Sequence, residues 1–396
     1  MKRMKLQDCC VFISDGDHQA PPKSDEGVPF ITISNITPDN RLDFNNAKYV
    51  PLEYYEKLSG KSKAIRNDIL YSVVGSFGKP VLIDENRKFV FQRHIAILRP
   101  DPEKVIPEFL YYSMLSPQFY TTADYLAIGA AQRTLSLDSL RNIEIEIPTL
   151  EQQKRVVDVI APIDKKVREN AKINDYLEEM AQTIYDYWFV QFNFPNKNGT
   201  PYKASGGNLF YNMLLKKEIP SNWAVDTIGN LLSKVPNSTK IPSTAYCENG
   251  SIPIIDQSSN FIAGYTNDET SILVNPNGYI IFGDHTRVVK YVRFPFARGA
   301  DGTQIIDSNN SNMPNELFYQ VIKSIDLSNY GYARHFKYLK DIVIAIPPTD
   351  LAYAYTEKVS RWYKIQASLI KENMVLCQLR DWLLPMLMNG QATIED

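Results

Sequence analysis

The stretch Leu140–Pro148 (LRNIEIEIP) returns 199 residues later as Leu339–Pro347 (LKDIVIAIP). A duplication of this length indicates two structural units of the same kind. We therefore expect the protein to perform one task at two related places. The same offset carries apolar positions of the first copy onto apolar positions of the second: Val156, Ile160, Ile163, Leu177, Met180 and Ile184 fall on Tyr355, Val359, Trp362, Leu376, Leu379 and Leu383.

The composition fits a chain with more than one domain. It has 396 residues, of which 44% are hydrophobic, and this length favours two or three domains. No apolar run approaches about 18 residues and the N-terminus is too polar for a secretion signal, so we expect a cytoplasmic protein that does not contact a membrane. A net charge of -2 neither demands nor excludes a nucleic-acid partner. The four cysteines lack paired spacing and are expected to be reduced.

Sequence patterns divide the chain into five segments. Residues 1–148 and 219–348 contain short alternating strands separated by Gly, Pro and Asn, with one helix inserted among them, and are predicted to be mixed domains. Residues 149–192 and 349–396 have helical periodicity. Residues 193–218 have the Pro, Gly and Asn content of an exposed linker. The predicted fold class is α+β, with two long helices between the globular domains and an internal repeat.

The first helical segment has a defined start and a predicted break. Thr149 and Gln152 fit a capping box, in which each side chain accepts a hydrogen bond from the backbone N–H of the other residue. Pro162 removes a backbone donor. We therefore expect a short helix that ends near Ile160, followed by a long helix from Pro162 to about Phe189.

Apolar residues recur about every 3.5 positions along both helical segments, which is typical of a coiled coil. Asn174 interrupts the first seam, and Asn373 occupies the equivalent position in the second. If a pseudo-twofold axis pairs the helices antiparallel, these two asparagines lie within about one helical turn of each other and fix the helix register. In the alternative interpretation, each asparagine simply faces solvent.

Motifs for catalysis are missing from the sequence. The two Pro-Pro pairs lack the flanks of an amino-methyltransferase motif, and Gly75–Pro80 lacks the spacing of a phosphate-binding loop. In Asp84–Lys88 adjacent carboxylates would point to opposite sides of an extended chain, so this cluster is a poor metal site. The four histidines form no ligand-spaced pair. We therefore expect no catalytic residue, no metal and no cofactor in this chain.

Several segments together resemble the specificity subunit of type I restriction-modification enzymes. They are Gly129–Thr134 (GAAQRT), the repeated LRNIEIEIP stretch, the LEQQ helix start at residue 150 and Tyr187–Gln191 (YWFVQ). The resemblance covers essentially the whole chain. It implies that each mixed domain is a target-recognition domain for double-stranded DNA, that the long helices are spacers, and that the subunit has no catalytic centre.

The resemblance also implies partners. They are two modification (methyltransferase) subunits, which would bind S-adenosylmethionine, and two restriction (motor nuclease) subunits for cleavage. The second copy departs from the family pattern at two places. Pro348–Ala352 lacks the Gln of the capping box, and Gly331–His335 replaces Gly129–Arg133. Residue-level roles are therefore less well defined in the second domain, whereas the architecture is not affected.

The predicted layout suits DNA recognition. A helix from residue 162 to residue 189 would be about 40 Å long, which is close to the roughly 34 Å of one turn of B-DNA. Two domains at that distance can face the same side of a duplex. We therefore expect a bipartite target with an unread spacer. Because the two domains differ in their loops, the half-targets should differ and the whole target should be asymmetric.

Recognition of a target requires Arg, Lys, Gln or Asn side chains on base edges and further cations on phosphates. For each candidate, a plain surface role is the alternative. Two other classes of function also stay open: a coiled-coil interaction scaffold without DNA recognition, and a self-sufficient DNA methyltransferase or nuclease. The candidates at predicted turns and strand ends are Lys79, Arg93, Gln132 and Arg133 in the first domain and Arg287, Lys290, Arg298 and Arg334 in the second. A separate basic cluster, which we interpret as a solvated face, contains Lys57, Lys61, Lys63 and Arg66.

Overall fold

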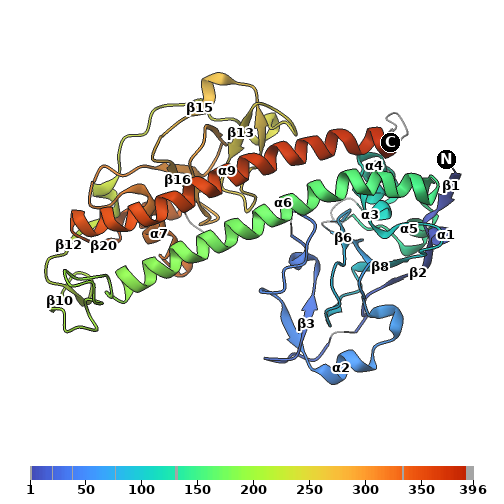
Figure 1. The fold of residues 1–396 in the computed structure, drawn as a ribbon, viewed down its shortest axis with the longest axis horizontal. Coiled ribbons are helices and arrows are strands. Elements are labelled where there is room, and N and C mark those ends of the chain that lie inside the picture. The colour runs from blue at the N-terminus through green and yellow to red at the C-terminus, as the bar shows by residue number, and fades with distance from the viewer. Residues whose placement is uncertain are drawn as a thin grey trace. The chain divides into compact units, whose positions relative to one another are not determined.

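Two compact units make up the chain in the computed structural model. The first unit consists of Met1–Lys166 and Leu376–Asp396, and the second consists of Val167–Val375. Both units mix helices and strands (Figure 1), in agreement with the predicted α+β class. The structure describes residues 2–19, 21–37, 39–75, 77–129, 133–331 and 334–388.

Antiparallel pairing builds most of the first unit. A four-stranded sheet has the order β2 (Cys10–Asp15), β8 (Ile95–Pro100), β5 (Ile69–Ser72) and β6 (Pro80–Leu82). A three-stranded sheet has the order β4 (Lys48–Val50), β3 (Val28–Ile31) and β7 (Val90–Phe91). A separate ladder joins β1 (Lys2–Lys5) to β9 (Glu144–Ile147). All four residues of β5 are buried. This strand therefore forms the centre of the first domain.

Short helices complete the first domain, and side-chain caps define two of them. The Ser116 hydroxyl accepts a hydrogen bond from the Phe119 N–H at 3.2 Å, and the Ser136 hydroxyl accepts one from the Ser139 N–H at 3.0 Å. The helix predicted at residues 107–116 is confirmed. The helices are α1 (Leu6–Cys9), α2 (Leu52–Lys57), α3 (Pro107–Leu115), α4 (Pro117–Leu126) and α5 (Leu137–Asn142), with 3-10 turns η1 (Ile33–Asn35) and η2 (Gly60–Ser62).

In the described residues of the second unit, the strands form four paired groups. One sheet has the order β17 (Val289–Val292), β16 (Tyr279–Gly283) and β19 (Thr303–Ile306). Another has the order β14 (Gly264–Thr266), β13 (Ile252–Ile255), β18 (Phe296–Arg298) and β15 (Ile272–Leu273). β12 (Ala224–Thr227) pairs with β20 (Val343–Ile346), and β10 (Leu209–Asn212) pairs with β11 (Lys217–Pro220). The shorter helices are α7 (Asn315–Lys323) and α8 (His335–Asp341), with η4 (Ile228–Leu231), η5 (Ser243–Ala245), η6 (Glu269–Ser271) and η7 (Ser328–Tyr330).

The two globular domains pair equivalent strands in the same way. β5 lies between β6 and β8, just as β16 lies between β17 and β19, and all four pairings are antiparallel. β3 runs parallel to β7, and β13 runs parallel to β18. The sequence duplication thus extends to strand pairing, which makes β5 and β16 equivalent central strands.

The first long helix is continuous through the position where a break was predicted. α6 (Leu150–Tyr185) contains Pro162 in its interior and continues into a π-helical turn, η3 (Asp186–Val190). The predicted end near Ile160 is therefore wrong. Proline inside a helix costs about 3 kcal/mol, but Ile160 is buried in the core of the first unit. We attribute the continuity to this packing, which a local sequence rule does not include.

The start of α6 is confirmed as predicted. The Gln152 N–H donates to the Thr149 hydroxyl at 3.3 Å, and the Thr149 N–H donates to the Gln152 side-chain oxygen at 3.2 Å. This is the reciprocal arrangement of a capping box. The second long helix, α9 (Thr349–Met388), also contains a proline, Pro385.

Within the second unit, α6 and α9 run antiparallel (Figure 1). The Asn373 amide donates to the carbonyl of Val167 at 3.1 Å, and the Gln366 amide donates to the carbonyl of Asn174 at 2.9 Å. Farther along, the Tyr355 hydroxyl donates to the carbonyl of Ala181 at 3.3 Å. From one hydrogen bond to the next, the residue number rises along α6 and falls along α9, as antiparallel helices require.

Asparagines form a buried polar contact between these helices. Asn170 is fully buried, and its amide donates to the Asn373 side-chain oxygen at 2.8 Å. Asn174 lies one turn after Asn170, and both Asn174 and Asn373 line a cavity of about 320 Å³. The direct side-chain partner of Asn373 is thus Asn170. The predicted pairing of Asn174 with Asn373 stays a prediction.

The segment predicted to be a linker is mostly exposed but has structure of its own. β10 and β11 form a hairpin in it. The Phe194 ring stacks on Tyr202 with centroids 4.7 Å apart and on Trp223 with centroids 5.9 Å apart. These aromatic contacts anchor the segment to the second domain, so it is not a flexible spacer along its whole length.

Each unit completes its core with residues from both long helices. In the first unit, Val156 and Ile160 of α6 pack in the same core as Leu384 and Leu387 of α9. Burial of each such side chain contributes about 1.5 to 3 kcal/mol. The globular domain and the helix ends of the first unit therefore form one cooperative core.

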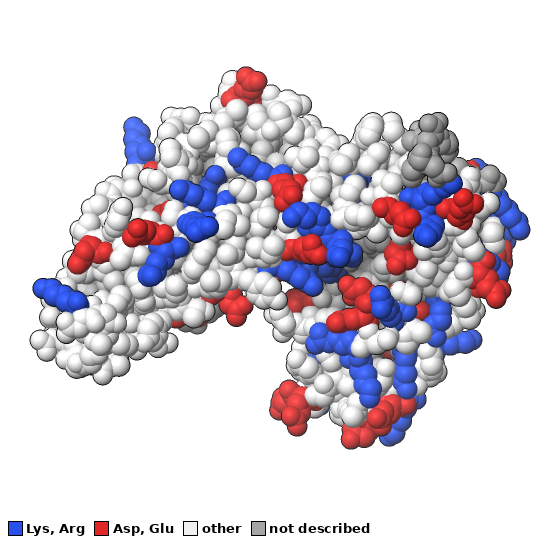
Figure 2. All heavy atoms as spheres, viewed as in Figure 1, with Lys and Arg blue, Asp and Glu red and all other residues white. Residues whose placement is uncertain are grey.

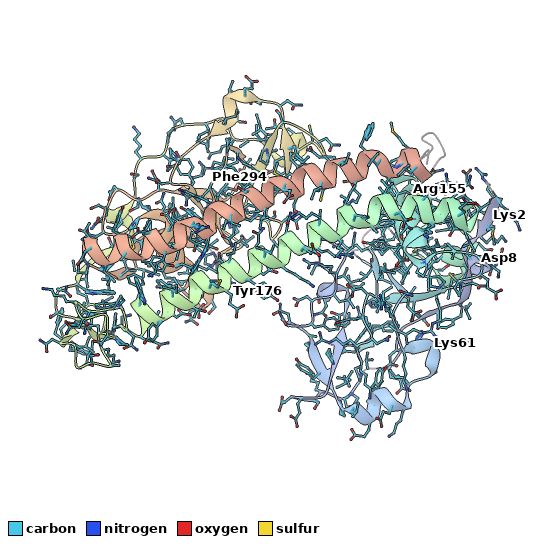
Figure 3. The ribbon with its side chains drawn as sticks, in the orientation of Figure 1. Lys2, Asp8, Lys61, Arg155, Tyr176 and Phe294 are labelled. Carbon is cyan, nitrogen blue, oxygen red and sulfur yellow. The ribbon has the colours of Figure 1, made fainter. Side chains whose placement is uncertain are left out.

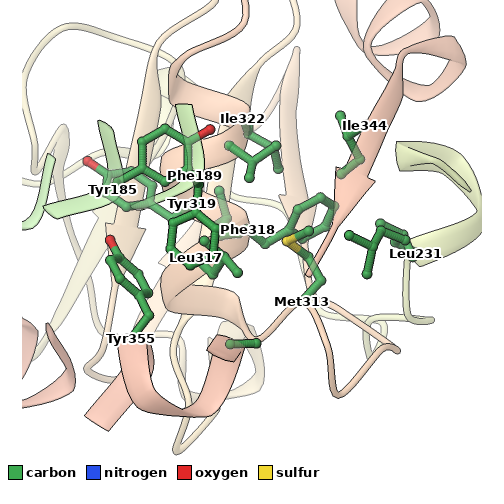
Figure 4. Close-up of a cluster of buried hydrophobic side chains, with 14 of the residues drawn as sticks. Tyr185, Phe189, Leu231, Met313, Leu317, Phe318, Tyr319, Ile322, Ile344 and Tyr355 are labelled. Atoms are coloured by element: carbon green, nitrogen blue, oxygen red, sulfur yellow. The ribbon is translucent and has the colours of Figure 1, made fainter. Parts of the chain in front are cut away.

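The second unit uses the equivalent helix positions. Tyr355 and Val359, which correspond to Val156 and Ile160 by the sequence repeat, are both fully buried. Figure 4 shows Tyr355 close to Tyr185 and Phe189 and to side chains of α7. The repeated apolar frame thus marks core positions in both units.

Candidate nucleic-acid interface

The first-domain candidates converge on the end of the central strand β5. The Ser72 N–H donates to the carbonyl of Lys79 at 3.1 Å, and the Gly75 N–H donates to the carbonyl of Arg133 at 3.0 Å. Between them, the Val73 N–H donates to the carbonyl of His94, the residue after Arg93, at 3.0 Å. Three segments far apart in sequence therefore place Lys79, Arg93 and Arg133 around one strand end.

These cations differ in how freely they can reach a ligand. Arg93 is exposed in the turn between β7 and β8, whereas Lys79 is half-buried. Arg133 pairs with the Asp124 carboxylate at 2.8 Å and also donates to the Asp124 carbonyl. Arg133 thus holds its loop against α4, and only part of its donor capacity remains for a ligand. Gln132 lies outside the described residues.

The second domain presents a comparable tip at the end of β16. A hairpin turn, Asp284–Arg287, joins β16 to β17 and is closed by a hydrogen bond from the Gly283 N–H to the carbonyl of Val288 at 2.8 Å. Arg287 is exposed and has a φ of +62°, a conformation that few residues other than glycine adopt. Arg334 is also exposed, and it precedes His335, whose N–H donates to the carbonyl of Asp284 at 2.9 Å. Arg287 and Arg334 therefore flank one strand end.

Lys290 has an internal role in this structure. Its side chain is only 4% exposed, and its ammonium donates to the carbonyls of Asp256 at 2.9 Å and of Asn260. Burial lowers the pKa of Lys290 to about 8, although the nearby Asp256 carboxylate opposes this shift. The Lys290 side chain thus holds the loop that contains Asp256 and Asn260 and is not available to a ligand.

Arg298 is likewise used within the domain. Its guanidinium donates to the carbonyl of Thr303 at 2.8 Å, and burial lowers its pKa. Of the four second-domain candidates, Arg287 and Arg334 are thus the exposed ones. The burial of Lys290 and the internal contact of Arg298 follow from long-range loop packing, which a run of basic residues in sequence does not reveal.

The structure also exposes candidate residues that sequence reasoning missed. Tyr125, at the end of α4, is 86% exposed, and Ile128 is 72% exposed. Ile128 lies beside Arg133, because it exchanges backbone hydrogen bonds with Thr134 at 2.9 and 2.8 Å, and Tyr125 follows Asp124, which pairs with Arg133. In the second domain Thr286 is exposed next to Arg287. No sequence signal distinguishes these side chains from buried ones of the same type.

Charge is not concentrated in one field on the face seen in Figure 2, where Lys and Arg alternate with Asp and Glu. The separate basic cluster in the first domain precedes β5. Lys57, Lys61 and Arg66 are exposed there, and Lys61 is labelled in Figure 3. This cluster lies toward the N-terminal end of β5, whereas the candidate cations surround its C-terminal end. The structure therefore separates two basic regions that a charge count would combine.

Both long helices expose apolar side chains at related positions. On α6, Tyr176 is 63% exposed and Met180 is 47% exposed. Tyr176 is labelled in Figure 3. On α9, Leu379, which corresponds to Met180 by the repeat, is 41% exposed, and Trp382 is 59% exposed. Exposed apolar side chains one helical turn apart are typical of a protein contact surface.

Residues 3–179 match the family model described as the type I restriction modification DNA specificity domain. The MjaIX type I specificity subunit of Methanocaldococcus jannaschii is 26% identical over 313 residues, which cover 74% of this chain and 70% of that protein. The chain thus carries a match to the type I restriction modification DNA specificity domain, and most of its length is similar to a type I specificity subunit. These matches support a DNA-recognition role for the chain.

Two further comparisons extend along nearly the whole specificity subunit. The putative MjaX specificity subunit of the same organism is 23% identical over 385 residues, covering 90% of this chain and 85% of that protein. A crystal structure of the type I S subunit from M. genitalium covers 98% of this chain and 95% of that chain, with 15% sequence identity and a TM-score of 0.53. The latter comparison shows a shared fold that includes both units.

Within the ranges that the structure describes, no helix is long and apolar enough to span a membrane. In the same ranges, no group of three or more His, Cys, Asp or Glu residues is placed to hold a metal ion.

Proposed function

We propose that each globular domain of this specificity subunit reads one half of a bipartite, asymmetric DNA target. One observation supports the proposal most strongly. Exposed cations lie at the C-terminal end of the central strand in both domains, Arg93 at β5 and Arg287 and Arg334 at β16. The strand pairing is shared while the connecting loops differ, which suits a constant frame that presents two different reading surfaces.

In this proposal α6 and α9 form an antiparallel coiled coil that relates the two domains by a pseudo-twofold axis and spaces the half-targets. Asn174 and Asn373 would then contribute to the register of the pair, together with Asn170. A buried asparagine at a helix interface can fix the register at some cost in stability.

The same helices would dock two modification subunits. The exposed apolar residues recur at equivalent positions, Met180 on α6 and Leu379 on α9. A repeated surface on a repeated helix predicts two equivalent partners rather than one. Restriction subunits would join the complex of specificity and modification subunits for cleavage.

The subunit itself would be non-catalytic. Methylation requires that the target base leave the stack and enter an enzyme pocket. We assign this pocket, and the S-adenosylmethionine that it needs, to the modification subunit. This assignment rests on the missing catalytic motifs of the sequence.

The experiment is a methylation assay with defined components. The specificity subunit is purified alone and together with the modification subunit encoded with it, and each is incubated with a library of duplexes and labelled S-adenosylmethionine. We expect methylation only by the complex, at sites with two constant parts separated by an unread spacer. Methylation or cutting by the chain alone would establish a self-sufficient enzyme. A complex that assembles but binds all duplexes equally, at every salt concentration tested, would establish a scaffold without DNA recognition.

A further inference from the structure

Three loops at the tip of the second domain meet at one side chain, Gln257. Its side-chain oxygen accepts a hydrogen bond from the His285 N–H at 3.1 Å, and its amide nitrogen donates to the carbonyl of Asp301 at 2.9 Å. Its backbone carbonyl accepts from the Thr286 hydroxyl at 2.6 Å. Gln257 thus joins its own loop to the Asp284–Arg287 turn and to the loop that contains Asp301.

Two glycines make room for this arrangement. A Cβ atom on Gly302 would lie 2.5 Å from the Gln257 amide nitrogen, and a Cβ on Gly283 would lie 3.0 Å from the Gln257 Cβ. Gly302 also has a φ of +76°. A side chain at Gly302 would displace the Gln257 amide, and one at Gly283 would also meet the Thr286 hydroxyl oxygen, so both glycines allow the present packing around Gln257.

The chemistry of the contact selects an amide. The His285 N–H needs an acceptor, and the carbonyl of Asp301 needs a donor. A glutamine side chain supplies both from one planar group, whereas a carboxylate supplies only the acceptor and an aliphatic group supplies neither. A glutamate at this position would also place its negative charge against the carbonyl of Asp301.

The loops that Gln257 joins carry exposed polar side chains. Thr286 and Arg287 project from the hairpin turn, and Asp301 is exposed on the neighbouring loop. Arg287 and Asp301 both have positive φ values, +62° and +50°. Residues other than glycine keep such conformations only where surrounding contacts hold them. From the opposite side, Lys290 holds the Gln257 loop through its hydrogen bond to the carbonyl of Asp256 at 2.9 Å.

We propose that Gln257 is a positioning residue that sets the sequence specificity of the second half-target by fixing the turn that carries Thr286 and Arg287. The inference rests on the proposed function, because it assigns one half-target to the second domain. Discrimination between bases depends on side chains held in one geometry relative to the base edges. Loss of the clamp should therefore broaden the bases accepted in the second half-target without the same effect on the first.

The test uses the complex with the modification subunit and a library in which each position of both half-targets is varied. Gln257→Glu retains one of the two side-chain hydrogen bonds, and Gln257→Met retains neither. Ser259→Ala, an exposed residue of the same loop, is the matched control. Methylation rates on matched and mismatched duplexes give a discrimination ratio for each position, and thermal unfolding of each complex reports on folding.

We expect discrimination in the second half-target to fall by about tenfold for Gln257→Met, the size of one good base contact. Gln257→Glu should cause a smaller loss, and Ser259→Ala should match the wild type. Discrimination in the first half-target serves as an internal reference and should change by less than about twofold. A folded Gln257→Met complex that keeps wild-type discrimination in both halves would overturn the inference, as would an equal loss in both halves. If the variant does not fold, the graded result for Gln257→Glu decides in the same way.

Failure of the inference can be distinguished from failure of the proposed function. If the wild-type target is bipartite and Gln257 variants leave it unchanged, only the inference is wrong. If the wild-type complex shows no bipartite target, the proposed function is wrong, whatever the variants do.

Discussion

Lys290 illustrates how far the role of a single residue depends on tertiary structure. The sequence places it in a basic run with Arg287 and Arg293 and predicts a DNA contact. In the structure the Lys290 ammonium donates hydrogen bonds to loop carbonyls. Arg293 forms an ion pair with the buried Glu316 at 3.1 Å. Two other candidates from the sequence, Arg287 and Arg334, are exposed at the strand end, and their contact with DNA stays a prediction. The sequence alone could not distinguish exposed basic side chains from buried ones, because burial depends on loops that lie far away in the chain.

Lys290→Met should destabilise the second unit. The substitution keeps the apolar stem but leaves the carbonyls of Asp256 and Asn260 without their donor, so we expect the free energy of unfolding at pH 7 to fall by about 1 to 3 kcal/mol. The pKa of Lys290 is about 8 in the folded protein and about 10.4 in an unfolded chain. The unfolded chain therefore binds the proton more tightly between these values, and wild-type stability rises with pH through this window. Below pH 8 the cost of burying the ammonium is fully present.

The measurement is urea unfolding of wild type and Lys290→Met at pH 7.5 and at pH 9.5. The wild type should gain stability relative to the variant at the higher pH. Parallel behaviour of the two proteins would show that the Lys290 ammonium is not the group responsible.

Arg93 and Lys61 test which end of β5 faces DNA. Both side chains are exposed, but Arg93 lies near the C-terminal end of the strand and Lys61 precedes its N-terminal end. If Arg93 contacts a phosphate, Arg93→Ala should weaken binding of all duplexes and reduce the slope of log affinity against log salt by about 1. Lys61→Ala should leave the slope unchanged. Fluorescence anisotropy of the complex over a range of KCl concentrations measures the affinity and the salt slope of each variant. A reduced slope for Lys61→Ala and an unchanged slope for Arg93→Ala would place the interface at the basic cluster around α2.

At the scale of elements, the sequence predicted the start of helix α6 correctly but placed a helix end where none exists. The capping box of Thr149 and Gln152 is a local motif, and the structure confirms it. The break at Pro162 is also a local rule, but here the buried Ile160 before the proline and the buried Asp164 after it, which pairs with Arg380 at 3.0 Å, hold the helix in place. The predicted linker also contains contacts that composition does not reveal, since the Phe194 ring stacks on Tyr202 within the segment and on Trp223 of the second domain.

The contact between Asn170 and Asn373 gives a prediction for the helix pair. Asn170→Ala removes a fully buried amide and leaves the Asn373 oxygen without its 2.8 Å donor. We expect a loss of about 1 to 3 kcal/mol in the free energy of unfolding. Replacing both asparagines by leucine should recover much of this loss, because two apolar groups need no hydrogen bond.

Urea unfolding followed by circular dichroism measures the free energy of unfolding of the wild type, Asn170→Ala and the double leucine variant. Asn174→Ala, one helical turn away, is the comparison. If Asn174→Ala costs as much as Asn170→Ala, the register contact is shared between the two asparagines. A double leucine variant that is less stable than Asn170→Ala would contradict the view that the polar contact serves register rather than stability.

At the scale of the whole molecule, the repeat predicts two partner-binding surfaces that can be removed one at a time. The first contains Tyr176 and Met180 on α6, and the second contains Leu379 and Trp382 on α9. A glutamate in the centre of an apolar contact must be desolvated without a partner, which costs several kcal/mol and is enough to prevent assembly at micromolar concentration. Met180→Glu should therefore abolish one surface, and Leu379→Glu should abolish the other.

Native mass spectrometry of the complex counts the modification subunits bound to each variant. We expect two for the wild type, one for either single variant and none for the double variant. Lys172→Glu, an exposed change on α6 that alters charge but removes no apolar side chain, should still bind two. Since each half-target would keep its own domain, single variants should still bind the full target while they methylate it more slowly. Loss of both modification subunits from a single variant would show that the two surfaces form one cooperative site, and the repeat would then describe the fold without describing the assembly.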